Sequence, residues 1–348
     1  MIRSSKFLDE DFDELCLFID PLIWYNLFIL LVMVVQLCCY GYQSPEGGEV
    51  LMYYSPLRYP GGKGKLAPFM KMIIEKTGHV GGTYIEPFAG GAGIAVDLLL
   101  NDVVSEIVIN DYDKGIYSFW RAILTETKRF IADINSVNIT IPEWEHQHMV
   151  YLNQQKKYSY ELGFATFYLN RTNRSGIIKG GVIGGKEQTG KWTMEARFHR
   201  EHLIERILEI AKQKRRIHLF NKDINSFLIN YAPKYSDNAL IYFDPPYYEK
   251  GRELYMNFLQ HKDHVKIKSE IERLEKADWV ITYDDCPEIL SLYHDHICKR
   301  INWNYSAATK RIVNEIVIFR NTEMIPTEEE FHINKVKTVL HDIHDVAK

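Results

Sequence analysis

Short apolar runs of strand length alternate with amphipathic segments along most of the chain beyond residue 80. The first unit, residues 83–100, is typical of a strand, a glycine turn and a helix, because Ile94, Ala95 and Leu98 recur at helical spacing. Further apolar runs end in acids or asparagine. They predict buried strands within residues 106–113, 216–223, 239–248, 278–285 and 314–321.

Helical patterns lie between several of these strands, at residues 115–124, 263–276 and 286–296. Strands that alternate with helices predict an α/β fold with a Rossmann-like, doubly wound sheet. In such sheets ligands bind beyond the carboxyl ends of the strands, so the glycine turn and the acids that follow each strand are expected to gather at one edge.

Residues 131–214 interrupt this alternation with helical, polar and basic sequence. Within them, the glycine-rich stretch 170–190 is too long to serve only as a connector. We therefore expect a mainly helical inserted domain at 131–214, between two parts of one core at 52–130 and 215–322. The tail that follows, 323–348, carries no informative pattern.

The first part of the chain, residues 1–51, has a different character. Its segment 21–43 has no charged residue and is apolar all round, which predicts a transmembrane helix. The preceding residues are acidic, which does not fit a secretory signal peptide. Two interpretations stay open: an extension whose span contacts the membrane as a single-pass anchor, or a dispensable extension upstream of a true start at Met52.

Cysteine usage indicates the compartment. The chain has 348 residues and five cysteines, an odd number, with neither Cys-x-x-Cys nor zinc spacing. This favours a reducing, cytoplasmic environment and argues against a disulfide framework. No metal site is expected.

Charge is distributed unevenly along the chain. The whole protein carries a formal charge of −4, yet residues 151–220 hold 14 Lys or Arg against six Glu and no Asp. Such a basic stretch is what phosphate binding requires, although a run of this kind also occurs on ordinary solvated helix faces.

The glycine turn resembles a nucleotide-binding loop. Gly90, Gly91 and Gly93 lie between a strand and a helix, where backbone can approach a ligand and the helix N-terminus offers free N–H groups. Asp111 ends the next strand about 20 residues later, where an acid can bind both ribose hydroxyls. The spacing does not match G-x-G-x-x-G, so a smaller nucleoside cofactor is expected rather than a dinucleotide.

Upstream, the sequence RYPGGKGK is a second candidate for this pocket. Tyr59 could lie on a flat ring, and Lys63 could face a carboxylate. The alternative is a solvent-exposed basic turn.

The sequence Asp244-Pro245-Pro246-Tyr247 follows a predicted strand. The amine of adenine is a poor nucleophile and needs hydrogen-bond acceptors as it becomes tetrahedral. Asp244 and the carbonyl of Pro245 could accept its two N–H groups while Tyr247 stacks on the base. The alternative is a strand-ending turn in which Asp244 binds its own backbone.

Together, the segments PLRYPGGKGKL, YIEPFAGGAGIAVDLL, INDYD, FYLNRTNRSG, ARFHREHLIERILEI and FDPPYY resemble, in order, the adenine-specific DNA methyltransferases of the Dam type, from about residue 53 to 320. The resemblance implies a methyltransferase fold and transfer of a methyl group from S-adenosylmethionine to N6 of a flipped-out adenine. It implies catalytic roles for Asp244, Pro245, Pro246 and Tyr247, and cofactor contacts for Tyr59, Lys63, Glu86, Phe88, Gly90, Gly91, Asp111, Asp223 and Asp244.

In that family the insert is the target-recognition domain, so double-stranded DNA is the expected partner, and a restriction endonuclease is a candidate second partner. Amide and guanidinium groups can bind base edges or phosphates. The alternatives are methylation of an RNA base or of a protein glutamine, or a DNA-binding relative that is membrane-tethered or inactive. Candidate DNA contacts are Asn170, Arg171, Asn173, Arg174, Lys179 and Lys186.

Overall fold

The computed structural model describes residues 55–58, 63–154, 156–248, 259–306, 310–334, 336 and 340–343, without the side chains of 302–314. The described residues belong to one compact unit, Tyr53–Lys348. The apolar segment 21–43 lies outside them. Within the described part, no helix is long and apolar enough to cross a membrane.

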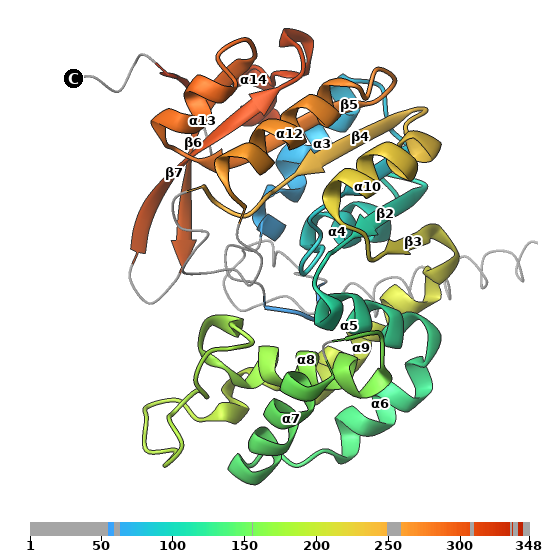
Figure 1. Cartoon of the computed structure of the whole chain (residues 1–348), viewed down its shortest axis with the longest axis vertical. Helices are drawn as coiled ribbons and strands as arrows, with labels where there is room; N and C mark the ends of the chain where they lie inside the picture. The colour runs from blue at the N-terminus through green and yellow to red at the C-terminus, as the bar shows by residue number, and fades with distance from the viewer. Residues whose placement is uncertain are drawn as a thin grey trace, which may run out of the picture. The chain divides into compact units, whose positions relative to one another are not determined.

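An eight-stranded sheet of order β3-β2-β1-β4-β5-β7-β6-β8 forms the centre of the described structure (Figure 1). The strands from β3 to β5 run parallel, whereas β7, β6 and β8 pair antiparallel. After β3 the chain returns to the other side of β1, so a topological switch point lies between β1 and β4, where α/β sheets bind ligands. The strands are β1 (Thr83–Glu86), β2 (Glu106–Asn110), β3 (Ile217–Phe220), β4 (Ala239–Phe243), β5 (Asp278–Asp284), β6 (Ile297–Ser306), β7 (Lys310–Phe319) and β8 (Leu340–Asp342).

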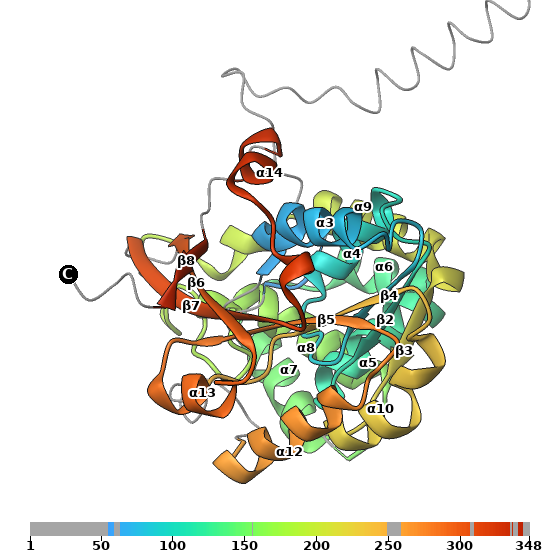
Figure 2. The same cartoon turned by 90° about the horizontal axis from the view of Figure 1, so that it is seen from above.

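Helices cover both faces of the sheet (Figure 2). Successive strand residues point to opposite faces, so Tyr84 enters the core that holds Phe69 of α3, while Ile85 enters the core that holds Phe227 of α10. Burial on both faces explains why these strands are continuous apolar runs in the sequence. The covering helices are α3 (Ala67–Lys76) and α4 (Gly93–Leu100) on one face, and α10 (Ile224–Asn230), α12 (His261–Glu272) and α13 (Pro287–Leu292) on the other.

A second group of helices forms a lobe beyond one edge of the sheet (Figure 1). α8 packs against α5 and α7, and α9 packs against α5 and α6. In its core the rings of Phe119 and Phe167 stack and Phe130 meets both edge to face, with centroids 5.3 to 5.9 Å apart. α5 joins this lobe, so the helical part begins before residue 131. Its helices are α5 (Lys114–Thr125), α6 (Thr127–Ser136), α7 (Ile141–Asn153), α8 (Tyr160–Thr172) and α9 (Arg200–Lys212).

The C-terminal part differs from the sequence prediction. The helix expected at 286–296 ends at Leu292, and the chain enters β6, a strand that the sequence did not predict, at Ile297. β6 is rich in polar residues, which hid it from a search for apolar runs. The expected tail contains α14 (Glu328–Ile333), which starts with a capping box at Thr327 and stacks Phe331 on Phe69, and the edge strand β8.

Candidate active site

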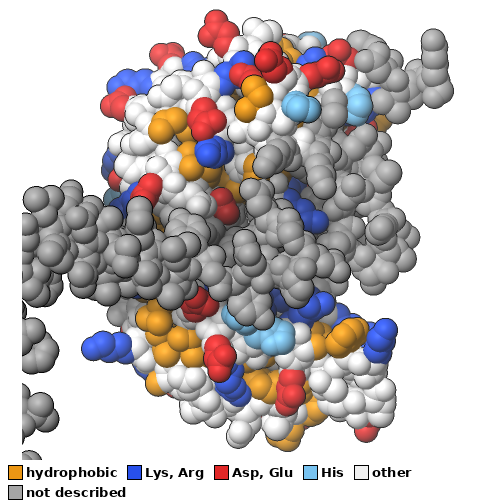
Figure 3. Space-filling view, turned by 180° about the vertical axis from the view of Figure 1, so that it is seen from behind, with side chains coloured by type: hydrophobic (Ala, Val, Ile, Leu, Met, Phe, Trp, Pro, Cys, Tyr) orange, Lys and Arg blue, Asp and Glu red, His pale blue; other side chains and the backbone are white. Residues whose placement is uncertain are grey.

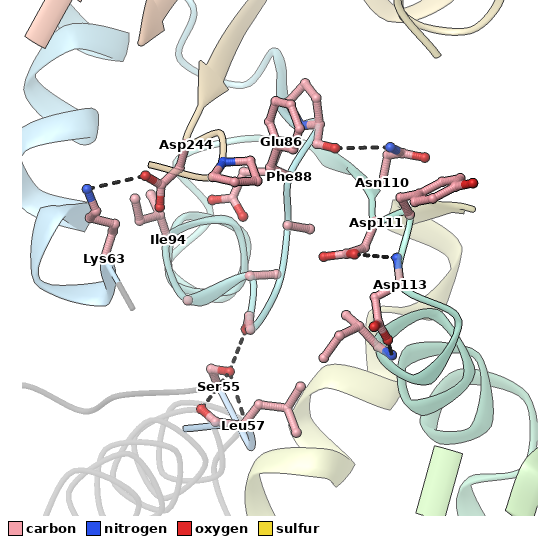
Figure 4. A pocket seen from close by; sticks show the side chains of 18 of the residues that line it. Ser55, Leu57, Lys63, Glu86, Phe88, Ile94, Asn110, Asp111, Asp113 and Asp244 are labelled. Atoms are coloured by element: carbon pink, nitrogen blue, oxygen red, sulfur yellow. Dashed lines mark hydrogen bonds and ion pairs between the residues drawn. The ribbon is translucent and has the colours of Figure 1, made fainter. Parts of the chain in front are cut away.

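A cavity of about 860 Å³ opens at the carboxyl ends of β1, β2 and β4. Figure 4 shows Lys63 and Asp244 on one side of this cavity, Asp111 and Asp113 on another, and Glu86 and Phe88 between them. The structure therefore brings together residues as distant in the chain as Lys63 and Asp244, which are 181 positions apart. The expected cofactor residues that line it are Lys63, Glu86, Phe88, Gly91, Asp111, Asp223 and Asp244.

The glycine turn is held to the end of β2 by hydrogen bonds. Gly90 has a φ of 48°, and its N–H donates to Asp111 Oδ2 at 2.8 Å. Its carbonyl accepts from Trp120 Nε1 at 2.9 Å, which ties the turn to the helical lobe. A Cβ atom on Gly93 would lie 3.3 Å from the Gly64 backbone, so glycine allows the two loops to approach closely.

Asp111 accepts a second backbone N–H, from Asp113 at 2.8 Å, through Oδ1. Burial, together with the neighbouring carboxylate of Asp113, raises the pKa of Asp111 to about 7. Each carboxylate oxygen has two acceptor sites, so both can still accept from the hydroxyls of a ribose. Asp111 thus has a structural role in addition to the ligand contact expected from the sequence.

Glu86 ends β1 beneath the glycine turn and is 5% exposed. Its Oε1 accepts the N–H of Ala95 at the start of α4, at 3.1 Å. Burial raises the pKa of Glu86 to about 8, and the charge of Asp244 adds to the rise. This residue therefore anchors α4 and also lines the cavity.

Asp244 leads the Asp-Pro-Pro-Tyr segment directly after β4. Its Oδ1 lies 3.3 Å from Lys63 Nζ and accepts from Thr282 Oγ1 at 3.2 Å. Burial raises the pKa of Asp244, while Lys63 opposes the rise. These contacts differ from the alternative turn in which Asp244 binds its own backbone, because Lys63 belongs to η1 (Lys63–Leu66) and Thr282 to β5.

Glu315 of β7 completes this cluster, and no motif in the sequence pointed to this residue. Its side chain is fully buried, Oε2 accepts from Lys63 Nζ at 2.6 Å, and Oε1 accepts from the Tyr247 hydroxyl at 2.6 Å. β7 runs antiparallel to β5 and pairs Glu315 with Asp284, the last residue of β5. Glu315, where the pairing of β7 with β5 begins, thereby reaches the edge where the parallel strands end.

The loop after β4 is held at its far end as well. The N–H of Tyr248 donates to Asp284 Oδ1 at 2.8 Å. Pro246 lines the cavity and Pro245 is buried. Anchors on both sides of the two prolines limit the movement of this loop, which is the condition for a precisely placed acceptor carbonyl.

A family model described as "D12 class N6 adenine-specific DNA methyltransferase" matches residues 59–308. This is most of the chain, and it includes the glycine turn, Asp111 and the Asp-Pro-Pro-Tyr segment. The chain belongs to this family.

The family uses S-adenosylmethionine as its methyl donor, and the protein is an adenine methyltransferase of this kind. The cavity has the size of a site for a small organic ligand, and it combines an N–H-rich turn with an acid at the end of β2, so the residues fit that cofactor. The predicted methyltransferase fold is confirmed by the sheet order and the family match.

Comparison with solved structures gives distant likenesses. The chain is 12% identical to the rRNA methyltransferase aviRa from Streptomyces viridochromogenes, with a TM-score of 0.36 over 81% of this chain and 95% of that one. It is also 12% identical to a conserved hypothetical protein from Streptococcus pyogenes, with a TM-score of 0.28 over 70% and 89%. No curated protein matched the chain. At these TM-scores the family match alone carries the assignment.

Two of the expected DNA contacts of this methyltransferase are interior residues. Asn170 is fully buried and bonds both backbone groups of Arg58, at 2.7 and 2.8 Å. Asn173 is also fully buried, accepts from Trp144 Nε1 and donates to two loop carbonyls. Their amides hold the lobe together, and this corrects the expectation that they lie free to read base edges.

Arg171 is only 8% exposed and lines the cavity from the lobe side. Its guanidinium donates to the carbonyls of Arg197 and Pro56. Burial lowers the pKa of Arg171 to about 9, with a smaller contribution from the nearby charges of Arg58, Arg206 and Arg197. Among the described residues, no carboxylate forms an ion pair with any of these four arginines, which we call the arginine cluster.

The remaining expected residues lie at different places. Arg174 and Lys179 are exposed, and Lys179 lines the cavity, whereas Lys186 pairs with Glu145 at 2.8 Å. Asp223 lines the cavity and also caps α10 by accepting from Ser226 N–H. Tyr59 lies outside the described residues. On the face that Figure 3 shows, acidic and basic side chains are interspersed, so the basic excess in the sequence does not form a surface of one sign there.

Proposed function

We propose that the protein methylates N6 of adenine in double-stranded DNA and that the target base leaves the duplex to enter the cavity. The observation that carries the proposal is that Asp244 and Pro246 line the same cavity as Asp111 and Gly91. A methyl donor held at the glycine turn and an amine held at Asp244 would then meet in one enclosed space.

The chemistry assigns a task to each group of the Asp-Pro-Pro-Tyr segment. S-adenosylmethionine supplies a methyl group activated on a sulfonium. Asp244 and the Pro245 carbonyl accept the two N–H groups of the amine, which raises electron density on nitrogen as the new C–N bond forms and the C–S bond breaks. The proton that the amine then loses leaves along one of these two hydrogen bonds. Tyr247 stacks on the base and holds it in line.

The lobe side of the cavity supports a nucleic acid substrate. Arg58, Arg171 and Arg206 line it, and burial lowers the pKa of each. Among the described residues these three guanidinium groups form no ion pair with a carboxylate, so they are electrostatically suited to an anion such as a backbone phosphate. Extruding a base costs a few kcal/mol, which phosphate contacts and stacking offset. Exposed Arg174 and Lys179 would extend these contacts.

The test is methyl transfer from tritiated S-adenosylmethionine to three acceptors: mixed-sequence duplex DNA, total RNA and a glutamine-containing protein extract. We expect label in DNA, recovered as N6-methyladenine after digestion. Asp244→Ala should abolish it. The control is Asp237→Ala, an exposed aspartate that pairs only with Lys276 at 3.0 Å in the described structure.

Label in RNA or in protein instead of DNA would replace the proposed substrate. Full activity of Asp244→Ala would remove the proposed catalytic role of that residue. Digestion and mapping of labelled DNA would also give the recognition site, which provides the defined duplex for the experiments below.

A further inference from the structure

Glu315 makes two hydrogen bonds that the proposed reaction does not by itself account for. One carboxylate oxygen accepts from the Tyr247 hydroxyl and the other from Lys63 Nζ, both at 2.6 Å. Its own side chain is fully buried. A buried carboxylate with two charge-assisted or short hydrogen bonds holds its partners far more firmly than a solvated one.

The bond to Tyr247 places the ring that is proposed to stack on the base. Tyr247 follows two prolines on a loop, and loops rarely hold a side chain to the tolerance that in-line transfer needs. The hydroxyl at the far end of the ring is fixed by a strand of the sheet, β7. The backbone after the ring is fixed by Asp284, which β7 pairs opposite Glu315. The ring is therefore held from both ends by adjacent strands.

The bond from Lys63 to Glu315 affects how well Asp244 can accept a hydrogen bond from the target amine. Lys63 Nζ lies 2.6 Å from Glu315 Oε2 but 3.3 Å from Asp244 Oδ1, so the ammonium group is drawn toward Glu315. A carboxylate that is tightly paired to an ammonium is a weaker acceptor for a second donor. Glu315 thus keeps the lone pairs of Asp244 available for the target amine. Thr282 Oγ1, which also contacts the Tyr242 hydroxyl, donates to Asp244 Oδ1 and helps to orient this carboxylate.

We propose that Glu315 is the positioning residue of the active site: it holds the Tyr247 ring in place over the target base and holds Lys63 back from Asp244. This inference rests on the proposed function. Glu315 touches neither substrate nor cofactor in this assignment, and it acts through the two side chains that do.

The experiment compares Glu315→Gln, Tyr247→Phe and the double variant of the full chain, on the duplex that carries the mapped site. Tyr247→Phe keeps the ring and removes only the hydroxyl. Glu330→Gln is the control, because it alters another ion-paired glutamate, 2.9 Å from Lys76, outside the residues that line the cavity. Single-turnover methyl transfer is measured with both substrates saturating, and S-adenosylmethionine binding is titrated for affinity and stoichiometry.

We expect Glu315→Gln to lower the single-turnover rate by about tenfold to a hundredfold, as the loss of one charge-assisted hydrogen bond implies. Tyr247→Phe should lower it by the same factor or less, and the double variant should be no slower than Glu315→Gln, because coupled residues are not additive. Binding stoichiometry should be unchanged. A duplex with 2-aminopurine at the target position should show a smaller fluorescence rise with the variants, since the extruded base is less firmly held.

Three results would overturn the inference: a wild-type rate in Glu315→Gln, single effects that multiply in the double variant, or a rate loss matched by an equal loss of binding stoichiometry, which would mean a purely structural role. Failure of the proposed function is distinguishable from all three, since the unaltered protein would then transfer no label to adenine at any rate.

Discussion

The two walls of the cavity carry buried charge of opposite sign. The sheet wall gathers the carboxylates of Glu86, Asp111 and Asp244, and burial raises the pKa of each. The lobe wall gathers the guanidinium groups of Arg58, Arg171 and Arg206, and burial lowers the pKa of each. Desolvation thus disfavours the charged form on both walls.

The walls differ in how that charge is compensated. Asp111 accepts two backbone N–H groups, and Asp244 faces an ammonium group and a hydroxyl. Arg171 donates only to backbone carbonyls in the described structure. The carboxylates are held as acceptors with spare lone pairs, suited to hydroxyl and amine donors, whereas the arginines are suited to an anion that carries full charge. The sheet wall therefore suits the proposed ribose and amine donors, and the lobe wall suits the proposed DNA phosphate.

The largest expected effect comes from changing one acceptor of the sheet wall. Asp244→Asn keeps the shape of the side chain but replaces one acceptor with a donor. We expect methyl transfer at saturation to fall by about a hundredfold to a thousandfold, the cost of losing one well-placed charge-stabilising group. Single-turnover labelling measures this, with cofactor affinity followed in parallel. A fall of less than about threefold would show that the sheet wall does not supply the acceptor.

A change on the lobe wall should weaken DNA binding instead of slowing the methyl-transfer step. Arg171→Met should weaken duplex binding by about tenfold and reduce its dependence on salt concentration by about one unit of slope, while cofactor affinity stays unchanged. Filter binding over a salt series tests this, with exposed Arg215 changed to Met as the matched control. If cofactor affinity falls and DNA affinity does not, Arg171 contributes to cofactor binding and not to DNA binding.

The raised pKa of the carboxyls predicts a pH effect on stability. The pKa of Glu86 rises from its ordinary 4.5 to about 8 in the folded protein, so the folded state binds more protons than the unfolded state between these values. The free energy of unfolding should therefore fall as pH rises from about 5 to about 8. Glu86→Gln retains an oxygen for the Ala95 N–H and should flatten this fall. Urea unfolding at several pH values measures it, and an unchanged slope in the variant would assign the effect to other groups.

The smallest expected effect comes from a substitution in the lobe that should lower stability without changing ligand binding at either wall. Ser159 caps α8 by accepting from Leu162 N–H at 3.0 Å, so Ser159→Ala should cost about 1 kcal/mol of stability. Cofactor and DNA affinities should stay unchanged at a temperature where the protein is folded. Altered cofactor binding would show that the lobe is coupled to the sheet wall through Trp120 and the glycine turn.

Much of the sheet wall could be predicted from the sequence, because its residues follow strands directly. Parallel strands that are buried on both faces appear as apolar runs, and the next polar residue falls at their carboxyl edge. Asp111 and Asp244 were placed in this way, and both line the cavity. The glycine turn was found for the same reason, since it lies in the short connection, residues 87–92, between β1 and α4.

The lobe wall could not be predicted in the same way. In a helical lobe, the direction of a side chain depends on which helices pack together, and adjacent polar residues in Asn170-Arg171-Thr172-Asn173 all proved to be buried. The two asparagines bind backbone, while Arg171 reaches the cavity. Nothing in the local pattern distinguishes these outcomes, because the contacts of Asn170 with Arg58, of Arg171 with Arg197 and of Asn173 with Trp144 each span more than 20 positions.

The sequence by itself determined the alternation of strands and helices, the glycine turn and the acids at the strand ends, since these features depend on local periodicity and on the geometry of a parallel sheet. Only the tertiary structure decided that Glu315 meets Tyr247 and Lys63, and that Arg58, Arg171 and Arg206 share one wall. Those contacts require β7 to enter the sheet antiparallel beside β5 and α8 to pack against α5. Long-range packing sets them, and no local pattern records it.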